Sequence, residues 1–186
     1  MLKIDNISFS YGEKQILKDF SLNIENNKRY WIFGESGSGK TTLVRLILGL
    51  EVPQSGTIIK PHDLKPSVVF QENRLLPFKT ALQNILLVEG NRQAAIDNLK
   101  ALGLEKETNT PVNQLSGGMK RRVAIARALS VNFDFLILDE PFTGLDNENV
   151  KIAIERILNV AGEKPILLVT HSPEEAELLG AKQIKI

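Results

Sequence analysis

The stretch that decides the fold is Gly34-Glu35-Ser36-Gly37-Ser38-Gly39-Lys40-Thr41-Thr42. It follows an apolar run at residues 30–33 that predicts a buried strand. It precedes an apolar-periodic segment, beginning at Thr41, that predicts a helix. A strand, the pattern GxxxxGK[ST] and a helix in this order are typical of a P-loop.

The residue types of this stretch suit phosphate binding. The glycines let the backbone fold tightly, so that successive N–H groups face phosphate oxygens at a helix N-terminus. Lys40 is expected to neutralise the β- and γ-phosphates, and Thr41 to supply a hydroxyl to Mg²⁺. The alternative, a glycine-rich loop that merely turns, requires a chance match at every motif position.

The rest of the sequence alternates between strand and helix patterns. Residues 135–138 and 166–169 are continuous apolar runs, as expected of strands buried on both faces of a parallel sheet. Residues 41–50 and 150–161 carry apolar side chains at helical spacing, and Gly162 ends the second pattern. This alternation predicts an α/β fold of the P-loop NTPase kind, with a mostly parallel core sheet flanked by helices.

Two regions depart from this alternation. Alternating patterns at residues 7–11 and 20–24, around a turn at Gly12, predict an antiparallel β subdomain. Residues 72–115 show helical spacing and predict a small helical insert. We therefore expect a single domain over residues 1–186, with the antiparallel β region and P-loop core in about 1–71, the helical subdomain in about 72–115 and the second part of the core in about 116–186.

Composition limits the possible partners. The 186 residues include 23 Lys and Arg against 22 Asp and Glu, which argues against binding nucleic acid or anionic lipid through bulk charge. The chain has no cysteine, which excludes disulfides and thiolate metal sites and fits a reducing cytosol. Asp5 stands where a signal peptide needs apolar residues, and no apolar run approaches the roughly 18 residues of a membrane span. These features predict a soluble chain.

Two adjacent carboxylates, Asp139 and Glu140, follow the apolar run at residues 135–138. The carboxyl end of a buried strand lies at the ligand crevice of a doubly wound sheet. Asp139 is therefore expected to hold Mg²⁺ through water, and Glu140 to polarise the attacking water beside the γ-phosphate as a general base. An ordinary solvated turn is the alternative.

A second candidate anion site is Leu115-Ser116-Gly117-Gly118, ahead of a basic, alanine-rich helix pattern. Ser116 is expected to cap the helix, with the glycines exposing the backbone. A flexible loop with a solvated basic face at residues 120–122 is the alternative. This motif resembles the signature of ATP-binding-cassette (ABC) ATPases. In that family two cassettes pair head to tail, and the ATP of each P-loop is capped by the signature of the other chain.

The resemblance implies further roles, position by position. Tyr11 matches the aromatic residue that stacks on adenine, although a strand tyrosine also suits a core. Gln71 matches the glutamine that senses Mg²⁺ and the γ-phosphate, with a polar strand end as the alternative. Asp146, in Thr143-Gly144-Leu145-Asp146, matches the D-loop at the cassette interface, and it also suits a helix cap. His171 matches the switch histidine at the γ-phosphate, with purely local hydrogen bonding as the alternative.

The predicted site thus has three overlapping sets of residues. The catalytic residues are Glu140, His171, Lys40 and Gln71. The ATP-binding residues are Tyr11, Gly34, Glu35, Ser36, Gly37, Ser38, Gly39, Lys40, Thr41, Thr42, Ser116, Gly117, Gly118 and Asp146. The Mg²⁺ residues are Thr41, Gln71 and Asp139, so the expected cofactors are ATP and Mg²⁺.

The resemblance covers nearly the whole sequence, and it implies the ATP-binding, ATP-hydrolysing subunit of an ABC transporter. Its implied partners are a second cassette, as an identical copy or a paralogue, and membrane permease subunits. The permease would dock at Glu72-Asn73-Arg74-Leu75-Leu76-Pro77-Phe78, whose apolar residues alternatively belong to a local core. An extracytoplasmic solute-binding protein would complete the system, with no nucleic acid. The chain would then lie in the cytoplasm, peripheral on the inner face of the cell membrane.

The sequence at residues 72–78 resembles that of importers of the nitrate, sulfonate, taurine and pyrimidine-precursor group. Import of a small solute is therefore expected. The alternative is an ABC ATPase that is not coupled to transport. DNA-maintenance relatives carry long coiled coils and ribosome-acting ones carry two cassettes, and this sequence has neither. A GTPase would need Asn-Lys-x-Asp, and Asn27-Lys28-Arg29-Tyr30 lacks the aspartate. Because the sequence ends in a strand pattern, no appended regulatory domain is expected.

Overall fold

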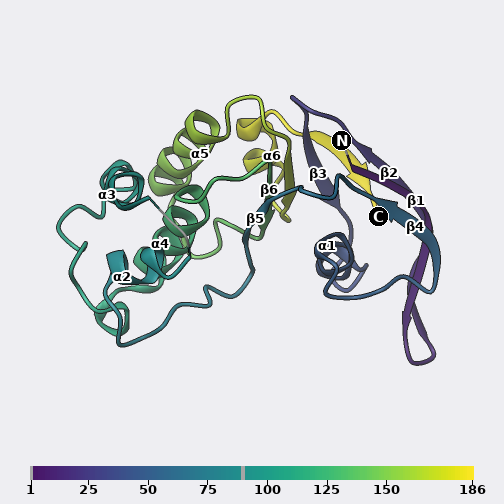
Figure 1. The fold of residues 1–186 in the computed structure, drawn as a ribbon, viewed down its shortest axis with the longest axis horizontal. Coiled ribbons are helices and arrows are strands. Elements are labelled where there is room, and N and C mark those ends of the chain that lie inside the picture. Colours follow the sequence, from purple (N-terminus) through teal and green to yellow (C-terminus); the bar gives the residue numbers. More distant parts are fainter. Residues whose placement is uncertain (1, 89–90) are drawn as a thin grey trace. The chain divides into compact units, whose positions relative to one another are not determined.

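The computed structural model describes residues 2–88 and 91–186, which form two compact units (Figure 1). Unit 1 comprises Met1–Pro66, Asp134–Asp139 and Glu163–Ile186, and unit 2 comprises Ser67–Phe133 and Glu140–Gly162. The domain predicted over residues 1–186 includes Met1, Glu89 and Gly90, which lie outside the described residues. The chain passes between the units several times, so each unit is built from segments distant in sequence.

Unit 1 contains a parallel sheet in which the strand order is β6-β7-β3-β8. Its strands are β3 (Arg29–Phe33), β6 (Phe135–Asp139), β7 (Ile166–Val169) and β8 (Lys182–Lys185). All residues of β6 and β7 are buried, which explains their unbroken apolar runs. Helix α1 (Lys40–Leu48) follows β3 and contacts β6, and α6 (Pro173–Leu179) connects β7 to β8. The predicted α/β fold with a parallel core sheet is confirmed.

Unit 1 also contains the predicted antiparallel region (Figure 1). Its sheet has the order β2-β1-β4, with β1 at Leu2–Tyr11, β2 at Lys14–Ile24 and β4 at Ser55–Ile59. Both pairings are antiparallel. Gly56 has a positive φ of 77°, and a Cβ there would lie 2.3 Å from the Asn6 carbonyl oxygen, so glycine alone fits beside β1.

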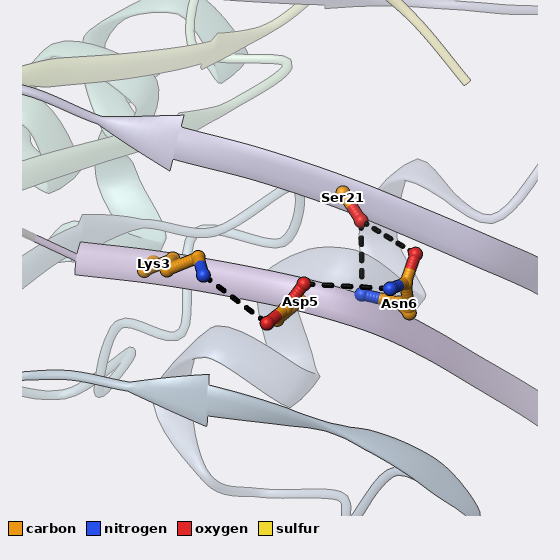
Figure 2. A network of polar contacts seen from close by, with 4 residues as sticks. All are labelled: Lys3, Asp5, Asn6 and Ser21. Atoms are coloured by element: carbon orange, nitrogen blue, oxygen red, sulfur yellow. Dashed lines mark hydrogen bonds and ion pairs between the residues drawn. The ribbon is translucent and has the colours of Figure 1, made fainter.

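The register of β1 and β2 shifts between Ile4 and Ile7, and polar side chains compensate for the irregularity (Figure 2). Asn6 has a φ of 48°, in the left-handed region. Its backbone N–H donates to Ser21 Oγ at 2.9 Å, and the Ser21 hydroxyl donates to Asn6 Oδ1 at 3.1 Å. The side chain of Ser21 therefore satisfies the amide that the shifted register leaves without a strand partner.

Unit 2 is mainly helical, and β5 (Pro66–Val69) leads into it. Its helices are α2 (Ala81–Leu86), α3 (Arg92–Ala101), the short 3₁₀ helix η1 (Val112–Gln114), α4 (Gly117–Leu129) and α5 (Asn147–Ala161). Helix α4 contacts α2, α3 and α5 (Figure 1). Buried alanines, among them Ala124 and Ala128, let the neighbours approach α4 closely. The helical character predicted for residues 72–115 is observed in α2, α3 and η1.

Within the described ranges 2–88 and 91–186, no helix is both long enough and apolar enough to cross a membrane.

Candidate functional site

The P-loop of unit 1 takes a conformation that requires glycine. Gly37 and Gly39 have φ values of 81° and 104°, where other residues are strained. A Cβ on Gly39 would lie 2.8 Å from Ile16 Cγ2, and one on Gly34 would lie 2.5 Å from Ser38 Oγ. The loop is therefore packed too tightly for side chains at these two positions.

Lys40 begins α1 and is buried, with 7% of its surface exposed. Its ammonium donates to the carbonyl oxygens of Gly34 at 2.9 Å and Glu35 at 2.8 Å. The Ser38 hydroxyl is also buried and has no hydrogen-bond partner among the described residues. A buried ammonium held by neutral carbonyls, beside an unsatisfied hydroxyl, fits a phosphate group, which would accept from both.

Asp139 ends strand β6 at the same sheet edge as the P-loop. The register aligns Asp139 with Val169 of β7, and Val169 with Ile32 of β3. All three strands are parallel, so their carboxyl ends meet at one edge. Unit 1 thereby brings together the P-loop after β3, the buried Asp139 and the segment Thr170–His171 after β7.

Exposed His171 lies between two well-anchored residues. Thr170 is buried, its carbonyl accepts from Trp31 Nε1 at 3.0 Å, and its hydroxyl donates to Glu175. Ser172 caps α6 by accepting from the Glu175 N–H at 3.2 Å. Burial raises the pKa of the Glu175 carboxyl, and the Thr170 hydrogen bond opposes that shift in part. The short turn that carries His171 is therefore fixed on both sides.

Tyr11, at the end of β1, is 42% exposed, so a core role is excluded. Its ring contacts Phe9 edge to face, with centroids 4.9 Å apart. Its hydroxyl donates to Glu51 Oε1 at 3.3 Å and accepts from Arg45 at 3.4 Å. The ring remains available to stack on a planar ligand.

The signature loop belongs to unit 2 and is built differently. Ser116 caps α4 by accepting from the Met119 N–H at 3.2 Å, as predicted for a helix start. Gly117 is exposed, and a Cβ there would meet nothing within 4 Å. A Cβ on Gly118 would lie 3.2 Å from the Gly144 carbonyl oxygen. Contacts within the chain thus account for Gly118 and leave Gly117 unexplained.

Asp146 caps α5. Its side chain accepts from the backbone N–H of Asn149 at 2.9 Å and from the Asn149 side chain at 2.8 Å. These hydrogen bonds lower the pKa of the Asp146 carboxyl. The capping alternative is therefore observed, and it leaves the exposed outer face of the loop at residues 143–146 open to a second role.

Gln71 and Glu140 are joined in unit 2 through Arg121 of α4. The guanidinium donates to the Gln71 carbonyl oxygen at 3.2 Å and to the Glu140 carbonyl oxygen. It also donates to Phe70 O at 2.6 Å and to Pro141 O at 2.7 Å. Arg121 therefore links the main chain of two predicted catalytic residues.

Glu140 has a φ of 48°, and a left-handed backbone costs a residue with a side chain about 1–2 kcal/mol. A proline follows it, which restricts its backbone further. Such a conformation persists when the surroundings determine it. Hydrogen bonds from Arg121 to the carbonyls of Glu140 and Pro141 help to hold Glu140 in this conformation.

The predicted docking stretch, residues 72–78, displays apolar side chains. Phe78 is 84% exposed and Leu76 is 49% exposed, whereas Leu75 is half-buried. Fully buried Asn84 of α2 holds the loop by accepting from the Leu76 N–H at 2.7 Å and donating to the Leu76 carbonyl oxygen at 3.0 Å. The two exposed side chains therefore sit on an anchored loop and not in a local core.

Sequence reasoning missed two residues that build these features. The sequence indicated no role for Arg121 beyond the basic helix behind the signature, and the structure buries it to 2% exposure. Its position was readable, because it shares a helix face with Ala124, Ile125 and Ala128 at helical spacing. Asn84, an amide inside an apolar helix pattern, carried a weaker signal of the same kind.

The predicted site residues fall into one group in each unit. Unit 1 holds Tyr11, the whole P-loop, Asp139 and His171. Unit 2 holds Gln71, Ser116, Gly117, Gly118, Glu140 and Asp146. Asp139 and Glu140 are neighbours in the chain, so the unit boundary runs between the two predicted carboxylates.

The chain belongs to the ABC transporter family, whose model matches residues 17–143. It is 39% identical over 196 residues to the aliphatic sulfonates import ATP-binding protein SsuB of Burkholderia pseudomallei (strain K96243), covering all of this chain and 59% of that protein. It is 35% identical over 206 residues to the ergothioneine transport ATP-binding protein EgtV of Helicobacter pylori (strain G27), covering 100% of this chain and 97% of that one. The chain thus spans about three fifths of the length of the sulfonate-import relatives from Burkholderia pseudomallei, Burkholderia mallei and Paraburkholderia xenovorans.

Solved structures of ATP-binding cassettes share the fold. The dimeric post-hydrolysis state of the cassette MJ0796, bound to ADP and Pi, superposes with a TM-score of 0.85 at 32% identity. That match covers 100% of this chain and 94% of the other. A bacterial Atm1-family ABC exporter with ATP bound has the same fold, with a TM-score of 0.86 at 24% identity.

Proposed function

We propose that this chain binds and hydrolyses ATP as the energising subunit of an ABC transporter that imports a small solute. The observation that carries the proposal is the P-loop, where the buried Lys40 ammonium donates to two neutral carbonyl oxygens and the buried Ser38 hydroxyl has no hydrogen-bond partner among the described residues. An anionic group would accept hydrogen bonds from both of these donors. Family membership makes ATP the expected source of that anion.

The proposed chemistry is distributed over both sets of residues. The P-loop holds the phosphates, while Thr41 and Asp139 hold Mg²⁺, assisted by Gln71. Glu140 acts as general base on the attacking water, and His171 contacts the γ-phosphate. Tyr11 stacks on the base. When bound, Mg²⁺ would supply positive charge that offsets the negative charge of the phosphates.

We propose further that the working unit is a head-to-tail pair of cassettes, identical or paralogous. Ser116, Gly117, Gly118 and Asp146 would then act on the nucleotide of the other chain. Gly117 supports this, because it is exposed and no atom of the described residues lies close enough to exclude a side chain there. The dimeric MJ0796 cassette gives a relative of the same fold in paired form.

Complementation between two inactive variants tests the pairing. Lys40→Ala removes the phosphate contact, and Ser116→Arg places a bulky side chain at the signature. In a mixed head-to-tail pair, one site combines the intact P-loop of one chain with the intact signature of the other. We expect the mixture to hydrolyse ATP although neither variant does so alone. Absence of turnover in the mixture, with each variant folded and the wild type active, would contradict the pairing.

A second test concerns Glu140. Glu140→Gln is expected to bind ATP with unchanged affinity and to slow turnover by roughly 10²- to 10⁴-fold, the usual contribution of a general base. It should also accumulate an ATP-bound dimer, detectable by size-exclusion chromatography with light scattering. Normal turnover in this variant would assign the general base to another residue.

For the partner, we propose that the anchored loop at residues 72–78 docks a membrane permease on the inner face of the cell membrane. Exposed Phe78 and Leu76 offer the apolar contact. The names of the relatives, which include sulfonate, arginine and ergothioneine transport, support a transport system, and we propose that a solute-binding protein completes it. Phe78→Ser should lower co-purification with the permease and leave the ATPase activity of the isolated chain unchanged.

A further inference from the structure

Arg121 is a cation in an apolar helix face. It is 2% exposed, and neighbours on its face of α4, among them Ala124 and Ile125, are buried apolar residues. A buried charge is retained when hydrogen bonds compensate for its lost hydration. The hydrogen-bond partners of Arg121 therefore indicate which segments its guanidinium positions.

The partners of Arg121 include oxygen atoms of two segments that are distant from it in sequence. One segment follows β5 and contributes Phe70 O at 2.6 Å, Gln71 O at 3.2 Å and Asn73 Oδ1 at 3.1 Å. The other follows β6 and contributes the carbonyls of Glu140 and Pro141. A planar guanidinium with five N–H donors can serve both segments at once, and a lysine ammonium cannot match that fork.

Both segments contain a strained residue that an arginine of α4 holds. Glu140 has a φ of 48° and is held by Arg121. Arg74 has a φ of 47°, and Arg127 donates to its carbonyl oxygen at 2.7 Å and to Asn73 O at 2.9 Å. The two arginines differ in their partners: Arg127 donates to the first segment, whereas Arg121 donates to both segments.

We propose that Arg121 is a positioning residue that ties the backbone at Gln71 to the backbone at Glu140 and so couples the docking loop to the general base. The inference rests on the function proposed above. A partner that displaces residues 72–78 pulls on Asn73 and Gln71, and the guanidinium transmits this displacement to the carbonyls of Glu140 and Pro141. The strained backbone at Glu140 has a more relaxed alternative, so a small displacement suffices to change its geometry.

Three variants of the full chain separate positioning from folding. Arg121→Met keeps the approximate side-chain volume and removes every donor, and Arg121→Lys keeps the charge without the fork. The matched control is Arg156→Met, which removes a partly buried guanidinium whose Nε donates to Asn98 Oδ1 at 2.7 Å, within the α3–α5 packing. Circular dichroism and thermal unfolding identify variants that fold.

We expect kcat to fall at least tenfold in both Arg121 variants, with the Kd for ATP within about twofold of wild type, because the P-loop proposed to hold the phosphates belongs to unit 1. Arg156→Met should keep kcat within about twofold. Since Arg121 acts through Glu140, the losses should not add: in Glu140→Gln, introducing Arg121→Met should lower single-turnover hydrolysis less than threefold further. Losses that multiply, a wild-type kcat in folded Arg121→Met, or an equal loss in Arg156→Met would overturn the proposal.

Amide hydrogen exchange gives a readout that needs no ATP hydrolysis. In Arg121→Met, exchange should rise together in residues 70–74 and 142–145. In Arg127→Met it should rise in residues 70–74 alone. If both segments stay protected from exchange in Arg121→Met, the proposed link between them is refuted, even if the chain is an ATPase. A wild type that neither binds nor hydrolyses ATP would instead refute the proposed function while leaving the exchange result readable.

Discussion

The P-loop and the signature loop are both glycine-rich turns that lead into a helix, and they differ in what their glycines are for. Gly37 and Gly39 of the P-loop have positive φ, and a side chain on Gly39 would collide with Ile16. Gly117 of the signature loop has no positive φ and no neighbour within reach of a Cβ. The first loop needs glycine to fold, whereas the second keeps an open surface that its own chain does not require.

The largest effect expected from this comparison is at Lys40. Lys40→Ala should weaken ATP binding at least ~100-fold, because each charge-assisted contact contributes roughly 1.5–3 kcal/mol and a phosphate takes more than one. Isothermal titration calorimetry measures the affinity. Lys60→Ala is the control, since Lys60 donates to Ile47 O at the far end of α1 and lies outside the loop. Retained affinity in Lys40→Ala would break the P-loop assignment.

The next prediction distinguishes backbone strain from steric clash within the P-loop. Gly39→Ala should lower ATP affinity about tenfold or more and destabilise unit 1. An alanine in this left-handed backbone conformation costs about 1–2 kcal/mol, and its Cβ would lie 2.8 Å from Ile16 Cγ2. Gly37→Ala is the matched control, with strain and an open surrounding. It should show the smaller loss in both binding and thermal unfolding. Equal losses would mean that packing against β2 is unimportant.

A smaller effect with an opposite sign is expected at Gly117. Gly117→Ala should raise the free energy of unfolding by about 0.5–1 kcal/mol, because alanine has a higher helix propensity than glycine and no atom of the described residues lies within 4 Å of the added methyl group. ATP turnover should nevertheless fall, since the methyl group would meet the nucleotide held by a partner cassette. Urea titration and a steady-state ATPase assay measure the two quantities. Unchanged turnover in the more stable variant would remove the in-trans role of this position.

The smallest effect contrasts the two units in their response to acid. The Glu175 carboxyl in unit 1 has a raised pKa, so its contribution to stability is complete below the ordinary value of 4.5 and is lost as pH rises through the folded value. The Asp146 carboxyl in unit 2 has a lowered pKa, so its contribution is present above the ordinary value of 3.8 and is lost as pH falls through the folded value.

Glu175→Gln should therefore flatten the loss of stability between pH 4.5 and the raised pKa, and Asp146→Asn should flatten the loss below pH 3.8. Urea titrations at a series of pH values, with unit-resolved hydrogen exchange, measure both. Identical slopes in wild type and Glu175→Gln above pH 4.5 would show that the Thr170 hydrogen bond fully offsets the burial.

The features that the sequence predicted well are those whose physics is local. The P-loop, the buried strands β6 and β7 and the caps at Ser116 and Asp146 each depend on residues within a few positions of one another. The hydrogen bonds of Arg121 to main-chain carbonyls were not predicted. These carbonyls lie about 50 and 20 residues away in the sequence, and every residue type has one. The register shift at Asn6 was hidden for the same reason, since Ser21 compensates for it from another strand.

The hydrogen bonds between Lys40 and the carbonyls of Gly34 and Glu35 also bear on kinetics. These hydrogen bonds restrict the lysine side chain, so we expect little of its conformational freedom to be lost when a nucleotide binds. We therefore expect ATP to bind without a preceding rearrangement of the loop. Association should appear in stopped-flow traces as a single phase whose rate rises linearly with ATP concentration, without the plateau that a slow opening step imposes.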